Sequence, residues 1–216
     1  MMKLLLGGGG SAEDERPTFE RFAAWVGVSG SVLYLPVAAG QAGGAYLDWI
    51  SSALTPLGVR HIDMWTDLAG HVPAEINRHQ AIFVGGGNTF SLLHRLRATG
   101  FDQALTGFVR RGGIVYGGSA GAIVMGRDIA TSSHLDENAV GLADTAGLDL
   151  LGGDSIWCHY QSPDDGLIRA YVARTRSPTI ALAETAGVWV RGPGQYILLG
   201  SEVVCRFTPD GKQQLA

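Results

Sequence analysis

Residues 111–126 read RGGIVYGGSAGAIVMG, and this stretch decides the fold. The strand-forming run at 114–116 leads into glycines and small residues at 117–121, and an apolar run at 122–125 favours a helix directly afterwards. The pattern G-x-S-x-G supplies the small neighbours that a sharp turn between a strand and a helix requires. The stretch therefore predicts a nucleophile elbow with Ser119 at its tip.

A helix that begins beside this serine would point free N–H groups at any negative charge that develops there. Glycine-rich turns between strands and helices are also common in α/β proteins, so the pattern alone leaves two readings open. Ser119 is either a nucleophile or part of an ordinary tight turn, and the rest of the chain must decide.

The 216 residues (22.8 kDa) suit one domain, residues 1–216, with a single core. A hydrophobic content of 46% against 17% charged residues excludes a disordered chain. A net charge of −4 and a pI near 5.8, without a long basic run, argue against a nucleic-acid-binding surface. We expect a short peptide or another small molecule as the partner.

The first residues contain only three leucines before Gly7, too few for a signal peptide or a membrane span, so we expect a cytoplasmic protein without membrane contact. Cys158 and Cys205 are expected to be buried, reduced thiols. The six histidines form no recognisable ligand motif, so no metal site is predicted. Residues 7–10 are four glycines that predict a flexible turn, since the Lys-Ser/Thr of a phosphate-binding loop is missing.

Apolar runs and amphipathic runs alternate along the chain, which indicates parallel strands joined by crossover helices. Strands are expected at 4–6, 31–36, 59–65, 81–84, 114–116, 155–160 and 179–183, with a small-residue loop at 38–44, helices at 18–26, 45–57, 101–111 and 166–175 and another after 89, and irregular structure at 131–150. Three short strands at 188–190, 196–199 and 203–207 are expected to end the chain as antiparallel hairpins. The predicted fold class is α/β: a doubly wound, mostly parallel sheet with helices on both faces and a C-terminal antiparallel hairpin region.

A second glycine-rich turn follows the strand at 81–84, in the stretch QAIFVGGGN. An oxyanion hole needs N–H donors from two directions, usually one after the nucleophile and one from a neighbouring loop. Ala120, with Gly86 or Gly87, is the predicted source of these donors. Asn88 is an expected helix N-cap and a candidate substrate contact. The alternative is that the glycines only make a tight turn.

His159 and Glu184 each follow a predicted strand, as Ser119 does. A serine hydroxyl needs a base to take its proton, and an imidazole serves that purpose near neutral pH. A carboxylate then orients the imidazole and stabilises its charged form. Ser119, His159 and Glu184 are thus the predicted catalytic residues, with Asp136 and Asp154 as alternatives to Glu184.

The motifs GGGNTF at 85–90 and GSAGA at 118–122, with a histidine after a strand and Glu184-x-x-Gly187, resemble the peptidase E family of serine peptidases, the aspartyl dipeptidases, which are relatives of class I glutamine amidotransferases. The resemblance runs from the first strand to the last hairpin. It implies a class I glutamine amidotransferase-like fold and a cytoplasmic, often dimeric enzyme without a cofactor that removes an N-terminal aspartate from short peptides. It also implies that Ser119 is the nucleophile, His159 the base and Glu184 its orienting carboxylate, with the oxyanion bound by the amides of Ala120 and Gly87.

The chain departs from that family at Gly118, where a tryptophan is common, and at Cys158, where a proline is common. The loop after His159 is also expected to be shorter. Other specificities therefore stay open: β-aspartyl peptides, cyanophycin-type polymers or a broader exopeptidase, and also a ligand-binding protein without activity. If the substrate is acidic, its carboxylate needs an arginine, and the candidates are three arginines after His159 that otherwise form a solvated helix face: Arg169, Arg174 and Arg176.

Overall fold

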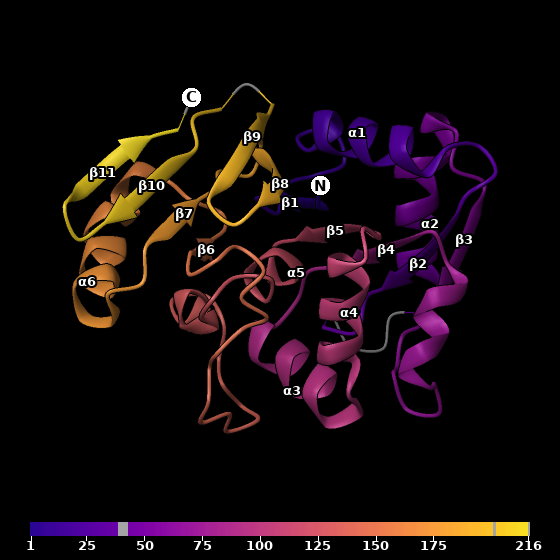
Figure 1. The fold of residues 1–216 in the computed structure, drawn as a ribbon, viewed down its shortest axis with the longest axis horizontal. Helices are drawn as coiled ribbons and strands as arrows, with labels where there is room; N and C mark the ends of the chain where they lie inside the picture. Colours follow the sequence, from indigo (N-terminus) through magenta and orange to yellow (C-terminus); the bar gives the residue numbers. More distant parts are fainter. Residues whose placement is uncertain (39–42, 201, 216) are drawn as a thin grey trace.

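The computed structural model describes residues 1–38, 43–200 and 202–215. It is a mixed α/β structure with two sheets (Figure 1). The strands are β1 (Lys3–Gly7), β2 (Ser31–Leu35), β3 (His61–Met64), β4 (Ala81–Val84), β5 (Ile114–Gly118), β6 (Ser155–Trp157), β7 (Thr179–Ala181), β8 (Gly187–Gly192), β9 (Gln195–Leu199), β10 (Cys205–Thr208) and β11 (Gly211–Gln214). The α-helices are α1 (Arg16–Val26), α2 (Gly43–Leu54), α3 (Thr89–Thr99), α4 (Phe101–Arg110), α5 (Ala120–Ile123) and α6 (Asp165–Thr175). Short 3-10 helices are η1 (Thr55–Leu57), η2 (Pro73–Arg78), η3 (Ile129–Ser132) and η4 (Ser162–Asp164).

The larger sheet has seven strands in the order β3-β2-β4-β5-β1-β8-β9. The first five are parallel, and β8 and β9 are antiparallel to their neighbours. Strands β1, β2, β4 and β5 are mostly buried because helices cover both faces of the sheet, whereas the edge strand β3 alternates between exposed and partly buried residues. Strand β1 illustrates the alternation: Leu4 and Leu6 join the core cluster against α3 and α4, whereas Leu5 joins the cluster against α1 and α2. This architecture confirms the predicted fold class.

The smaller sheet has the strand order β11-β10-β7-β6, and helix α6 packs against this sheet (Figure 1). The sequence placed β6 and β7 in the main sheet, and this placement is wrong. Strand β1 lies between β5 and the antiparallel β8, so β6 and β7 pair instead with each other, and β7 with β10. The prediction of three antiparallel strands at the end of the chain is also wrong in part. Strands β8 and β9 form a hairpin in the main sheet, but β10 belongs to the smaller sheet, where it pairs with β7 and with β11, a strand that the sequence does not predict.

The structure agrees with most of the remaining predictions. Residues 131–150 are largely irregular, and both cysteines are buried and free. Most of the loop expected at 38–44 lies outside the described residues. Helix α2 begins two residues earlier than predicted, and its last predicted turn is the separate helix η1. None of the helices in the described part of the chain is both long and apolar enough to cross a membrane.

The connection from β1 to α1 is held by a buried carboxyl group. Glu15 is 3% exposed, and its Oε1 accepts hydrogen bonds from the backbone N–H of Gly9 (2.6 Å) and Gly10 (3.2 Å). Its burial raises the pKa of the Glu15 carboxyl to about 8, although these two N–H donors act in the opposite direction. The flexible turn that the sequence predicts is therefore a hydrogen-bonded loop around a carboxyl group that is mostly protonated at neutral pH.

The elbow glycines predict a first effect on stability. A Cβ at Gly121 would overlap the Val84 carbonyl oxygen, whereas a Cβ at Gly166, also in a helix, meets nothing within 4 Å. We expect Gly121→Ala to lower the free energy of unfolding by roughly 1–3 kcal/mol or more, measured by urea unfolding. Gly166→Ala is the matched control and should be neutral or raise it by about 0.5–1 kcal/mol. Equal effects of the two substitutions would contradict the packing of α5 on β4.

A second prediction concerns pH. Between its ordinary pKa of 4.5 and about 8, Glu15 keeps a proton in the folded chain that the unfolded chain releases. Its contribution to stability is fully present below pH 4.5 and is lost as the pH rises to about 8. We expect the unfolding free energy of the wild type to fall relative to Glu15→Gln from pH 5 to pH 8, by up to about 1.4 kcal/mol per pH unit. Parallel pH profiles of the two proteins in urea titrations would refute this.

Candidate active site

Ser119 lies on the turn between β5 and α5 with φ 51° and ψ −117°. Residues other than glycine rarely adopt a positive φ, so the surrounding structure must hold this conformation. The two flanking glycines make room for it: a Cβ at Gly117 would overlap the Gly121 backbone, and a Cβ at Gly121 would overlap β4. The local structure is thus the elbow that the sequence predicts.

His159 follows β6, in the smaller sheet, and its Nε2 lies 2.9 Å from the Oγ of Ser119. The other ring nitrogen, Nδ1, lies 2.9 Å from Oε1 of Glu184, which follows β7. The imidazole is partly buried and the carboxylate is about half exposed. The structure therefore brings the three predicted residues together in one hydrogen-bonded chain, Ser119 to His159 to Glu184, although they come from two different sheets.

The end of β1 and the loop after it contact both Ser119 and His159. The backbone N–H of Ser119 donates to the carbonyl of Gly7 (3.3 Å), and the N–H of His159 donates to the carbonyl of Gly8 (2.9 Å). A Cβ at Gly9 would stand 2.5 Å from the imidazole Cε1 and 2.9 Å from the Cβ of Ser119. Only a residue without a side chain fits between serine and histidine, so the glycine run is part of the site.

The residues proposed as oxyanion donors come from the start of α5 and from the loop after β4. Ala120 is the first residue of α5, where a backbone N–H has no partner within the helix. A Cβ at Gly86 would lie 3.3 Å from the Cβ of Ser119 and 3.7 Å from its Oγ, so the loop after β4 approaches the serine closely. Gly87 has a φ of 126°, which side-chain-bearing residues rarely adopt. Their role as donors stays a prediction.

The other candidates make different contacts. The carboxylate of Asp136 accepts from the N–H of Thr89 (2.9 Å) at the start of α3. Asp154 is buried and bonded to the guanidinium of Arg206 (2.8 Å) and to the hydroxyl of Tyr196. Both carboxylates stabilise the fold in these positions, whereas Glu184 contacts the imidazole.

Asn88 is the N-cap of α3, as predicted, because its Oδ1 accepts from the N–H of Ser91 (2.9 Å). Its Nδ2 donates to the carbonyl of Glu137 (2.8 Å). These bonds account for Asn88 as a structural residue, and a substrate contact is not needed to explain it.

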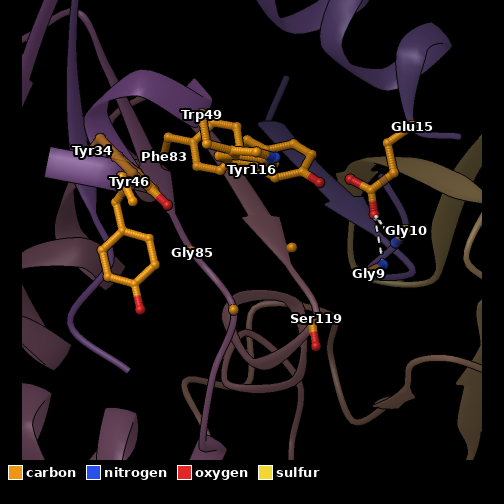
Figure 2. Close-up of a pocket in the computed structure, with 13 residues that line it drawn as sticks. Gly9, Gly10, Glu15, Tyr34, Tyr46, Trp49, Phe83, Gly85, Tyr116 and Ser119 are labelled. Atoms are coloured by element: carbon orange, nitrogen blue, oxygen red, sulfur yellow. Dashed lines mark hydrogen bonds between the residues drawn. The ribbon is translucent and has the colours of Figure 1, made fainter. Parts of the chain in front are cut away.

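A cavity of about 440 Å³ opens beside the Ser119 hydroxyl, between the edge of the main sheet and α2 (Figure 2). Glu15 and Gly10 form one side, and five aromatic residues form the other: Tyr34, Tyr46, Trp49, Phe83 and Tyr116. Sequence reasoning missed both sides. The glycines at 7–10 carried a usable signal, since they follow a parallel strand just as 85–87 do, but nothing in the run Glu13-Asp14-Glu15 marks the third acid as buried.

The arginines expected to read an acidic substrate make other contacts. Arg169 lies 3.8 Å from Asp165 and over the ring of Phe207, and Arg174 lies over Tyr171. Arg176 ends α6 in the left-handed conformation. None of the three lines the cavity as the structure describes it. Within residues 1–38, 43–200 and 202–215, no group of three or more His, Cys, Asp or Glu side chains is arranged to hold a metal ion.

The model of peptidase family S51 matches residues 4–198 of this chain. An uncharacterized peptidase of Listeria monocytogenes is 27% identical over 153 residues, which cover 68% of this chain and 75% of the relative. Peptidase E of Streptomyces coelicolor is 32% identical over 141 residues, 60% of this chain and 55% of that protein. The chain thus spans only about half the length of the peptidase E relatives it matches.

Two crystal structures share the fold. A candidate peptidase E protein from Listeria monocytogenes, 26% identical, superimposes with a TM-score of 0.75 and covers 94% of this chain and 100% of its own. A peptidase from an acI-B1 actinobacterium, 19% identical, has a TM-score of 0.71 and covers 99% and 93%. The resemblance drawn from the GGGNTF and GSAGA motifs is confirmed. Since the family model covers most of its length, the chain belongs to peptidase family S51 and is a serine-type peptidase.

Proposed function

We propose that this chain is a serine exopeptidase that hydrolyses short peptides through Ser119, His159 and Glu184. The observation that carries the proposal is the chain of two 2.9 Å contacts from the serine hydroxyl through the imidazole to the carboxylate. Because the three residues come from both sheets, residues 1–216 act as one catalytic domain. Cytoplasmic location and a homodimer are further parts of the proposal, and they rest on the family resemblance alone.

Acylation begins when the Ser119 oxygen attacks the scissile carbonyl carbon and its proton passes to Nε2 of His159. Glu184 holds the opposite ring nitrogen as the donor and stabilises the imidazolium. The carbonyl oxygen becomes an oxyanion, which the N–H groups of Ala120 and of Gly86 or Gly87 would bind. The intermediate then collapses, the C–N bond breaks, and the leaving amine takes the proton from His159.

Deacylation repeats these steps with water. The imidazole removes a proton from a water molecule, whose oxygen attacks the ester carbon of the acyl-enzyme. The second intermediate breaks the bond to the Ser119 oxygen, which takes the proton back from His159. The products are an amine and a carboxylic acid, and the chain returns to its starting state.

Family resemblance implies dipeptides with an N-terminal aspartate as substrates. The related alternatives are β-aspartyl or cyanophycin-type peptides and a broader exopeptidase. A second kind of function, ligand binding without turnover, has less support, because Ser119, His159 and Glu184 all make their mutual contacts.

The role of the serine is tested with a fluorophosphonate probe, which reacts with activated serine hydroxyls, together with a dipeptide panel. We expect the wild type to be labelled once and Ser119→Ala to be unlabelled, with kcat reduced at least roughly 10⁴-fold. Ser162→Ala, at an exposed serine, is the control and should behave as the wild type. Labelling that survives in Ser119→Ala would overturn the proposal.

The third member of the triad is tested by comparing two carboxylates. Glu184→Gln should lower kcat by roughly 10²–10⁴-fold, because the amide cannot stabilise the imidazolium. Asp136→Asn should keep kcat within a few fold, because its oxygen can still accept from the Thr89 N–H. Steady-state kinetics and thermal unfolding of both variants separate catalysis from stability. A large loss of kcat in Asp136→Asn alone would assign the role to that residue instead.

A further inference from the structure

The cavity beside Ser119 is walled by rings that already pack on each other. Phe83 and Tyr116 lie 4.2 Å apart between centroids, and Tyr34 meets Phe83 edge to face at 5.4 Å. Trp49 lies over this group, 6.0 Å from Phe83, yet 38% of its surface is exposed. The cavity has a volume of about 440 Å³, which falls within the range of roughly 300–1,000 Å³ that is typical of small-molecule sites.

The geometry of the reaction determines which half of the substrate lies in the cavity. The leaving amine must take its proton from His159, so it lies on the side of the imidazole. Among the described residues, those that line the cavity include Ser119, Gly86 and Gly118 but neither His159 nor Glu184. The acyl half of the peptide, bonded to the other side of the carbonyl carbon, therefore faces the cavity.

Where the structure describes it, the lining of the cavity provides no cation for an acidic side chain. No lysine or arginine lines it in the described part of the chain, and the undescribed positions 39–42, 201 and 216 contain none. Among the described residues that line the cavity, Glu15 carries the only carboxyl side chain, and it is 3% exposed. A substrate carboxylate in the cavity would be desolvated without a cation to pair with. A basic side chain would lack an anionic partner as well, because burial raises the pKa of the Glu15 carboxyl to about 8 and its Oε1 already accepts two N–H bonds.

We propose that this cavity binds an uncharged aromatic or bulky aliphatic side chain on the acyl side of the scissile bond, and that it selects against aspartate. The proposal rests on the exopeptidase function proposed above and names the substrate class of that site. Small residues on the sheet side, Gly85, Gly86 and Gly118, leave the space open, and the rings provide the apolar surface. Specificity then comes from side chains of β2, β4, β5 and α2, separate from the triad.

The test is a panel of dipeptides with alanine second and Phe, Leu, Ala, Asp or Lys first. We expect kcat/KM for Phe-Ala and Leu-Ala to exceed that for Asp-Ala and Lys-Ala at least 10-fold. Trp49→Ala should lower kcat/KM for Phe-Ala about 10-fold and leave Ala-Ala within twofold. Leu47→Ala is the matched control on the same helix, equally exposed at 38% and outside the cavity lining, and should leave every substrate within twofold.

Thermal unfolding would reveal whether Trp49→Ala loses its fold, and a second variant tests the same cavity independently. Ala45→Phe adds a ring at the exposed rim of the cavity and should reduce turnover of Phe-Ala more than that of Ala-Ala. Asp-Ala or Lys-Ala as the best substrate would overturn the inference, as would equal losses for Phe-Ala and Ala-Ala in both variants. Labelling of Ser119 by the fluorophosphonate without turnover of Phe-Ala or Leu-Ala would also overturn it. Absence of both labelling and turnover would instead show that the proposed function fails first.

Discussion

Two backbone hydrogen bonds, to the last residue of β1 and to the residue after it, hold the site together. The carbonyl of Gly7 accepts from the N–H of Ser119, and the carbonyl of Gly8 accepts from the N–H of His159. The first bond extends the pairing of β1 with β5, and the second connects the seven-stranded sheet to the segment after β6 of the four-stranded sheet, where serine and imidazole must meet. Main-chain groups at fixed spacing achieve this more reliably than long side chains, which lose rotamer freedom when they are ordered. The chemistry thus depends on the position of a loop that contributes no side chain to it.

Both reacting residues have a positive φ, 51° at Ser119 and 54° at His159. Such backbone costs roughly 1–3 kcal/mol at each residue and persists only where the surroundings enforce it. Here the enforcement is steric: glycines at 117 and 121 admit the elbow, and Gly9 fits against both the ring and the serine. Glu15 accepts a hydrogen bond from the N–H of Gly9, so a buried carboxyl group fixes the glycine that packs against both reacting residues.

The sequence predicts the parallel strands and the elbow well but not the pairing of β6 and β7, and the difference has a physical reason. Parallel strands and the elbow carry local signals, namely apolar runs and obligatory small residues, and they were located to within a few residues. The pairing of β6 and β7 has no such signal, because residues 155–160 resemble any other buried strand. Their partner β10 begins at Cys205, far along the chain, and only the antiparallel β8 beside β1 excludes them from the main sheet. Placing His159 at the end of a strand was correct, but naming the sheet required tertiary structure.

Reaction and specificity are encoded in different ways in this fold. The elbow, the oxyanion candidates and the contact to His159 depend on backbone and glycines, so they leave a recognisable motif. The cavity depends on which aromatic rings face α2 and on the buried carboxyl of Glu15. No periodicity in the sequence distinguishes Glu15 from the acidic residues before it. Gly118 illustrates the difference, because a Cβ there would meet the hydroxyl of Tyr116 at 2.9 Å. A side chain at 118 and the ring at 116 therefore compete for one space beside Ser119, so a change at either position would reshape the cavity without a contact to His159 or Glu184.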